Sequence, residues 1–334
     1  MITITSLRHA KSKNRIEELK KFPARISRGE MVWVDVEDPK ESEIKELKER
    51  FSLDSYAIED VMHGNQRPKM EDYKEYLFAV IHIPTLKNRK YETLEVFFFF
   101  QKNWIISIHS GSTEVTQAVE SRIKTRGLEP LASNPTPDLL FYTYLDFAVD
   151  AYYPMLDEAE EQIETLDSKA MTSFKQRSKK FDLMVGAMST IGGVRKRIRS
   201  LRKSLVPTRD MVGMIMRGAV PFIQDSSLRS FRDVYDHSFQ LLETIDNYRD
   251  RTSDVRELYI NLLMASTDNI IKLLTIVATI FLPLALLAGI YGTNFTPGFF
   301  EPGSSTPTGF YILIGSMLLI AIALLYSFRR SGWI

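Results

Sequence analysis

The residues that could carry chemistry in this chain lie along one apolar segment, residues 273–291, which contains no charged side chain. Alternating steps of three and four, counted from just before this segment, select a mostly small set: Asp268, Ile271, Thr275, Ala278, Leu282, Ala285 and Gly289. Small residues at this spacing let helices approach closely, and in a symmetric ring they would leave a narrow axial path. The same pattern also fits plain helix dimerisation or a packed anchor.

A second uncharged segment, residues 310–328, follows the first, and each is close to the roughly 20 residues that cross a hydrocarbon core. Lys272 precedes the first segment, Arg329 and Arg330 follow the second, and the loop 292–309 has no Lys or Arg. Because basic residues favour the cytoplasmic side, we expect a multi-pass protein of the cell membrane with both termini in the cytoplasm. Two spans cannot enclose a pore within one subunit, so transport through the lipid bilayer would require an oligomer.

Other kinds of chemistry have little support. The five histidines show no HExxH spacing, and the sequence lacks a phosphate-binding GxxxxGK[ST] loop, a GxSxG motif and any Cys. We therefore expect no enzyme and no small organic substrate. The 43 basic and 42 acidic residues nearly cancel, which gives no argument for nucleic-acid binding by bulk charge. A membrane-tethered scaffold is the alternative to transport, and ion flux in purified vesicles would separate the two.

The elements that must position the apolar segment are long helices. Residues 222–282 contain neither Gly nor Pro, which predicts one stalk helix over 226–291 whose last part is the first membrane span. At about 1.5 Å per residue this helix would be roughly 100 Å long, far beyond an ordinary globular helix. Pro283 is expected to bend the helix without ending it, because membrane helices can re-satisfy one freed carbonyl.

The preceding part of the chain is predicted to be an α/β domain over residues 1–130, followed by a charged helical hairpin over 131–225. Runs of β-branched and aromatic residues predict strands at 31–36, 76–83, 94–100 and 104–109, and helical spacing predicts helices at 41–50 and 55–63. In the hairpin, we expect antiparallel helices over 138–171 and 172–206. The first is acidic and the second basic, which predicts solvated faces that attract each other, or alternatively a cation-sensing pair of levers.

The end of the first span carries the most specific motif of the sequence. The C-terminal part of the sequence resembles the CorA family of divalent-cation channels in four consecutive features. These are the run KLLTIVATIFLPLALLAGIYGTNF, a short acidic loop, a second span, and a basic tail over residues 329–334 within FRRSGWI. The cytoplasmic runs Gln66-Arg67-Pro68-Lys69 and FRDVYDH, residues 231–237, also look like that family. The resemblance covers the whole chain. It implies an α+β cytoplasmic domain with a helical hairpin and stalk, two C-terminal transmembrane helices, and a funnel-shaped homopentamer.

The resemblance also implies residue roles. Tyr291, Gly292, Thr293 and Asn294 would form the selectivity filter, and Gly292 would allow its tight turn. Mg²⁺ sheds water reluctantly, so a ring of neutral Asn carbonyls suits a mouth that holds the hydrated ion. Asp268 would lie at the cytoplasmic mouth, Leu274 in a constriction that gates by dewetting, and Glu257 further down the pore.

In the family, divalent cations that bridge carboxylates of neighbouring cytoplasmic domains regulate the channel, and the resemblance implies the same here. The matched FRDVYDH run makes Asp233 the first candidate ligand, and the further candidates are Glu71, Asp72 and Asp150. Loss of the ion would let like charges push the subunits apart.

One residue, Thr293, bears on which ion is transported. Family members usually carry Met where this chain has Thr293, and zinc-transporting relatives also vary this residue. The expected cargo is Mg²⁺, with Co²⁺ and Ni²⁺, and the alternative is Zn²⁺ or another transition metal. The absence of Cys and of clustered His argues against zinc, which favours softer donors.

Overall fold

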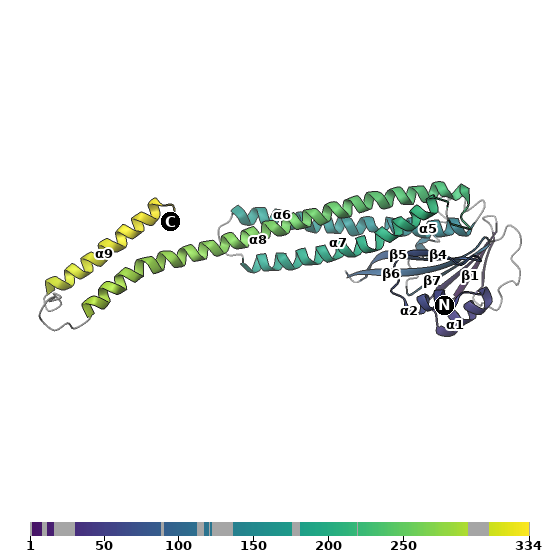
Figure 1. The fold of residues 1–334 in the computed structure, drawn as a ribbon, viewed down its shortest axis with the longest axis horizontal. Coiled ribbons are helices and arrows are strands. Elements are labelled where there is room, and N and C mark those ends of the chain that lie inside the picture. Colours follow the sequence, from purple (N-terminus) through teal and green to yellow (C-terminus); the bar gives the residue numbers. More distant parts are fainter. Residues whose placement is uncertain are drawn as a thin grey trace. The chain divides into compact units, whose positions relative to one another are not determined.

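The computed structural model describes residues 2–8, 12–16, 31–87, 90–111, 117–119, 121, 136–175, 181–218, 220–292 and 307–333. The chain divides into two compact units. The first contains residues 1–169 and 189–255, and the second contains residues 170–188 and 256–334. Figure 1 labels most of their helices and strands.

The first unit is built on a seven-stranded sheet with the order β2-β1-β3-β7-β6-β5-β4. Its strands are β1 (Ile2–Arg8), β2 (Ser12–Ile16), β3 (Met31–Glu37), β4 (Lys69–Asp72), β5 (Leu77–Lys87), β6 (Lys90–Phe100) and β7 (Trp104–His109). Only β3 and β7 pair in parallel, and every other pair is antiparallel. The four predicted strands are confirmed, including the β6–β7 hairpin, whereas β1, β2 and β4 were not predicted.

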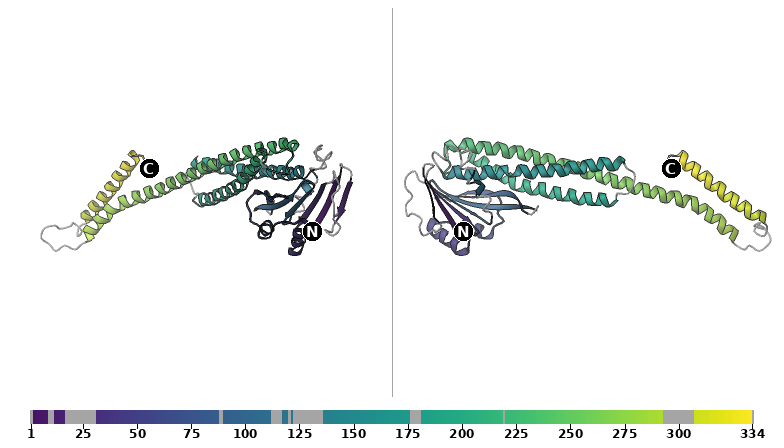
Figure 2. Two further views of the ribbon diagram at one scale, coloured as in Figure 1. Left: turned by 45° about the vertical axis from the view of Figure 1, so that its right-hand side comes forward. Right: turned by 180° about the vertical axis from the view of Figure 1, so that it is seen from behind.

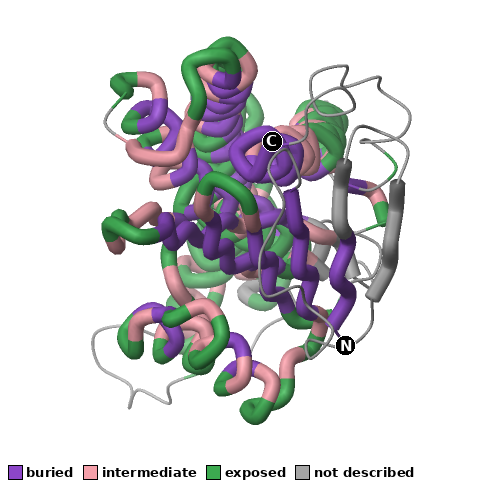
Figure 3. The backbone as a smooth tube through the Cα atoms, turned by 90° about the vertical axis from the view of Figure 1, so that its right-hand side faces the viewer, coloured by how far each residue is buried: buried purple, intermediate pink, exposed green. Residues whose placement is uncertain are grey.

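Helices cover both faces of this sheet, as the buried strands between helices in Figure 3 show. Side chains alternate across a strand, so Val34 and Phe99 belong to the core under α1 (Glu41–Phe51) and α2 (Ser55–His63). On the other face, Trp33 and Phe98 meet Tyr144 of α5 (Pro137–Asp150), with ring centroids 6.2 and 4.9 Å apart. Burial on both faces explains the uninterrupted phenylalanines of β6.

The helical part differs from the helices expected over 138–171 and 172–206: the first is divided, and the second continues past residue 206, through Pro207, to Met216. The helix predicted over 138–171 is divided at Ala151 into α5 and α6 (Tyr152–Lys175), and α7 (Phe181–Met216) follows. Pro154 provides a physical reason, because its missing N–H leaves the carbonyl four residues earlier without a helical partner. Pro is tolerated in the first turn of α6, where it stands. The division lets α5 lie on the sheet as a separate element.

After a short 3₁₀ turn, η2 (Asp225–Ser227), α8 runs without interruption from Leu228 to Gly292. It continues through Pro283, which confirms that this proline does not end the helix. Helix α9 spans Pro307–Arg330. Both apolar windows have high mean hydropathy, 2.5 and 2.3, yet only 6% and 0% of them is buried. Such uncovered apolar helices are typical of membrane spans.

The C-terminal end of α9 is closed by its own chain. Gly332 has a φ of 70°, and the backbone N–H of Trp333 donates to the carbonyl of Phe328 over 3.0 Å. The Gly332 N–H donates to the Arg329 carbonyl over 3.2 Å, and the rings of Phe328 and Trp333 lie 5.8 Å apart. This combination is the Schellman motif with its hydrophobic contact.

Candidate functional site

In the second unit, the membrane part of α8 has two distinct sides. One side is buried or half-buried at Ile276, Ile280, Pro283, Leu284, Leu287 and Tyr291. Helix α9 is half-buried at a matching series: Leu313, Met317, Ile320, Ala321, Leu324 and Phe328. Both series repeat at steps of three and four, which marks one face of each helix. The two helices therefore pack along these faces, and Figure 2 shows them running side by side.

The predicted small-residue stripe lies on the opposite side of α8. Its members are exposed in the single subunit, together with Leu274: Ile271, Leu274, Thr275, Ala278, Leu282, Ala285 and Gly289. Leu274 and Leu282 are 68% and 73% exposed. At about 100° per residue the stripe points away from the face that packs on α9. An apolar stripe left uncovered within one subunit is available to other copies of the chain or to lipid.

The predicted filter is only partly described. Gly292 is the last residue of α8 and is exposed, whereas Tyr291 is half-buried on the side that faces α9. Thr293 and Asn294 lie outside the described residues. Asp268 and Glu257, predicted for the mouth and the stalk, are both exposed on α8. The described part of the span, residues 273–291, thus offers no carboxylate ligand to a dehydrated ion.

The candidate regulatory carboxylates fall into two groups. Asp233, on α8, is exposed and lies 3.8 Å from His237 Nε2. Burial raises the pKa of Tyr153, and the nearby charges of Asp150 and Asp233 raise it further. These two carboxylates therefore share one neighbourhood.

Glu71 and Asp72 lie on the edge strand β4 and already have partners. Lys69 Nζ lies 2.7 Å from Glu71 Oε1 and 2.7 Å from Asp60 Oδ2. The Tyr73 hydroxyl donates to the other Glu71 oxygen over 3.3 Å. Asp72 Oδ1 accepts the Lys74 N–H over 2.7 Å. A cation at Glu71 would compete with Lys69, so Asp72 is the freer of the two.

Within one subunit, the part of the chain that the structure describes contains no group of three or more His, Asp or Glu that could hold a metal ion.

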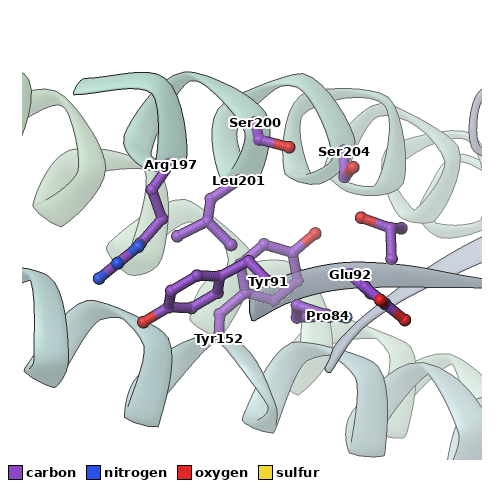
Figure 4. Close-up of a pocket in the computed structure, with 9 residues that line it drawn as sticks. Pro84, Tyr91, Glu92, Tyr152, Arg197, Ser200, Leu201 and Ser204 are labelled. Carbon is purple, nitrogen blue, oxygen red and sulfur yellow. The ribbon is translucent and has the colours of Figure 1, made fainter. Parts of the chain in front are cut away.

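A polar junction between the sheet and the helical pair was not predicted from the sequence. At the end of the β5–β6 hairpin, Arg197 of α7 lies over the ring of Tyr91, 3.8 Å from its centroid. Tyr91 donates a hydrogen bond to Glu158 of α6, and Arg197 lies 3.5 Å from the same carboxylate. Figure 4 shows the small cavity beside them, which is also lined by Tyr152 and Ser204. Its volume of about 30 Å³ suits ordered water and is too small for a larger ligand.

A half-buried histidine extends this junction. His82 Nε2 lies 2.7 Å from the Gln66 carbonyl, so this nitrogen carries the proton and donates. His82 Nδ1 then accepts from the Ser204 hydroxyl, 2.9 Å away on α7. Burial lowers the pKa of His82, and Lys203 lowers it further against the opposing effects of Gln66 and Glu95. The junction is therefore a structural link built on a neutral histidine.

The expected attraction between an acidic α6 and a basic α7 occurs at few positions. Among the described residues, Glu158 and Arg197 form the ion pair between the two helices. Two further ion pairs join this hairpin to α8: Arg202 to Asp246 over 3.0 Å and Arg251 to Glu160 over 3.4 Å. Most of the predicted charges face solvent.

A sheet domain, a helical bundle and two uncovered apolar helices with basic flanks define a membrane protein with both termini in the cytoplasm. The sequence profile of the family described as CorA-like Mg²⁺ transporter protein matches residues 28–330, and the chain belongs to this family. It is a divalent-cation transporter and not an enzyme.

Three relatives illustrate the similarity. The chain is 28% identical over 306 residues to the cobalt/magnesium transport protein CorA of Thermotoga maritima, covering 90% of this chain and 83% of that protein. The complete structure of the CorA magnesium transporter from Methanocaldococcus jannaschii has the same fold, with a TM-score of 0.81 and 23% identity over 100% of this chain and 99% of that one. The zinc transport protein ZntB of Pectobacterium carotovorum is 26% identical over 141 residues, 42% of each chain.

Proposed function

We propose that the protein is a homopentameric channel for Mg²⁺ uptake across the cell membrane, which also admits Co²⁺ and Ni²⁺. The observation that carries the proposal is the uncovered stripe of small residues on α8, opposite the face that packs on α9. In a ring of subunits these stripes would face a common axis, with α9 outside. Ala278, Ala285 and Gly289 would leave room for an ion path.

The ion would enter past Gly292, Thr293 and Asn294, with Tyr291 supporting this filter from the side of α9. Neutral amide oxygens would hold the hydrated ion through its waters, and Leu274 would form the constriction. Asp268 would add a ring of negative charge at the cytoplasmic mouth, and Glu257 another along the stalk. Because the span lacks carboxylates, nothing in it would demand that the ion lose its water.

Gating would follow from cytoplasmic Mg²⁺ bound between subunits. Asp233 would be one ligand, and Asp72, Glu71 or Asp150 of a neighbour would supply the others. The lack of a sufficient ligand group within one subunit, among the described residues, supports a shared site. Loss of Mg²⁺ would then leave like charges facing each other and separate the cytoplasmic domains.

The test is flux into vesicles that contain the purified full-length protein. We expect Mg²⁺, Co²⁺ and Ni²⁺ to enter and to compete with one another. Vesicles without flux of any divalent cation would contradict the proposed channel.

The second candidate is zinc transport, which the residue Thr293 and the partial similarity to ZntB favour. The same vesicles should show whether Zn²⁺ enters faster than Mg²⁺. Thr293→Met should be tolerated and should shift the preference towards Mg²⁺. A completely inactive Thr293→Met protein would mean that residue 293 is coupled to packing of this protein's own loop.

A further inference from the structure

Two helices of the first unit carry exposed charges of opposite sign. On α6, Asp157, Glu161 and Glu164 are exposed, and we call this set the acidic ridge. On α7, Arg195, Lys196 and Arg199 are exposed, and we call this set the basic ridge. Within each set, residues three or four positions apart lie on one side of the helix, and Arg195 and Lys196 are adjacent in the sequence. Each subunit thus presents one negative and one positive strip.

The ridges are not satisfied by each other within the subunit. Helices α6 and α7 bury apolar side chains, including Ala159, Ile163, Val194 and Ile198. Among the described residues, the ion pairs between the helices of this bundle join Glu158 to Arg197, Arg202 to Asp246 and Arg251 to Glu160, and none of these residues belongs to a ridge. The ridge residues therefore point away from the seam between the two helices.

Uncompensated ridges of this kind carry a cost. Like charges three or four residues apart on a helix repel each other, so each ridge destabilises its own helix. Residues 183–209 contain no Asp or Glu that could offset the basic ridge locally. A surface of opposite charge would remove the repulsion on both helices, and a second copy of the chain carries such a surface.

We propose that the acidic ridge of one subunit docks against the basic ridge of a neighbouring copy. The contact joins two different surfaces, so it is head-to-tail, and its repetition closes a ring when the rotation between copies permits. This inference rests on the proposed homo-oligomer and adds a cytoplasmic contact to the stripe in the membrane. The ridges lie on exposed helix faces, so salt weakens the contact.

Crosslinking tests the contact directly, because the chain has no native cysteine. Two full-length copies with different tags are co-expressed, one with Glu161→Cys and the other with Arg199→Cys, and the detergent-solubilised protein is oxidised. A disulfide-linked dimer that carries both tags is an inter-subunit product by construction. The matched control pairs Glu161→Cys with Glu49→Cys, an exposed carboxylate position on α1.

We expect the ridge pair to yield about tenfold more mixed dimer than the control, as several surface ion pairs together allow. Equal yields, in an oligomer that size-exclusion chromatography shows to be intact, would overturn the ridge contact and leave the proposed channel standing. A monomeric protein would instead contradict the homopentamer itself.

Charge exchange provides the second test. Glu161→Lys with Glu164→Lys, or Arg195→Glu with Arg199→Glu, should lower the yield of a disulfide between Asp157→Cys and Lys196→Cys copies about tenfold at low salt. All four substitutions in one chain exchange the signs of both ridges and should restore the yield, whereas Glu49→Lys should change nothing.

Failure of the fourfold variant to recover would contradict charge pairing. Loss on chelation of the disulfide between Asp157→Cys and Lys196→Cys copies that carry no charge exchange would show that divalent cations, and not the basic ridge, hold the acidic ridge.

Discussion

Asn294 is the residue on which selectivity depends if the proposed filter is right. Its amide oxygen is neutral, and five such oxygens in a ring would match the waters around a hydrated ion. We predict that Asn294→Ala abolishes selective uptake while the oligomer stays intact, because no other residue at that level offers the same oxygen. Flux into vesicles and size-exclusion chromatography are the measurements. Wild-type flux in this variant would remove Asn294 from the filter.

His82, also a single residue, affects how the stability of the folded protein depends on pH. Its lowered pKa means that the unfolded chain binds a proton more readily than the folded protein does. The contribution of His82 is therefore complete above the ordinary His pKa of 6.5 and is lost as the pH falls below it.

We predict that the melting temperature of the full-length protein falls between about pH 7.5 and 5.5, and that His82→Gln shows a smaller fall over this range. The glutamine can keep a donor towards Gln66 but does not titrate. His63→Gln is the control, because this histidine is exposed on α2. An identical pH dependence in wild type and His82→Gln would show that His82 does not titrate in this range.

At the scale of elements, substitutions on α8 and α9 test whether the small-residue stripe of α8 lines the ion path. We predict that Ala278→Leu or Ala285→Leu reduces ion flux at least about tenfold, because a larger side chain would fill a hydrophobic constriction. Ala323→Leu is the matched control, since Ala323 is exposed on α9 away from the α8 seam. Equal flux in all three variants would mean that the stripe does not line the path.

Much of this architecture could be predicted from local sequence. The strands rich in β-branched and aromatic residues, the long α8 and the two spans all have strong periodicity or composition. Strand β4 could not be predicted in this way, because its polar residues form a strand by pairing with β5, Lys69 opposite Val80. The division at Ala151 depends on Pro154 and on the sheet surface that α5 covers.

The candidate site, too, could be predicted only as far as local sequence determines it. Residue spacing identified the small stripe on α8, but only the structure shows which side of that helix α9 covers. Lys69 is another example: its ion pair with Glu71 joins two ordinary surface residues in the sequence, yet it makes Glu71 the less available ligand. Tertiary contacts decide which carboxylates are free.

At the scale of the whole molecule, the proposed gating requires Mg²⁺ to hold neighbouring subunits together. If a cation bridges Asp233 to an acidic partner, Asp233→Lys supplies the positive charge permanently. We predict that the wild-type protein becomes protease-sensitive on chelation, whereas Asp233→Lys stays protected, because packed subunits hide linkers that loosened ones expose. Limited proteolysis of the cytoplasmic domain, with and without Mg²⁺, is the measurement.

Glu243→Lys is the control for that experiment, since Glu243 is an exposed carboxylate on the same helix. It should remain sensitive to chelation. Digestion that ignores Mg²⁺ in the wild type and in Asp233→Lys would remove these carboxylates from the sensor, and the pore would have to be regulated in another way.

The closed end of α9 has a consequence for where this helix can stop. A helix ordinarily leaves its last carbonyls to water or to capping groups, and the hydrocarbon core of a membrane supplies no water for them. Here the N–H groups of Gly332 and Trp333 occupy two of them, and Trp333 shields the turn against Phe328. The helix can therefore end inside the interfacial layer without recruiting water, with the amphipathic indole ring at the depth where tryptophan is favoured. Deletion of the last three residues would uncap it, whereas a tag fused after Ile334 would leave the cap in place.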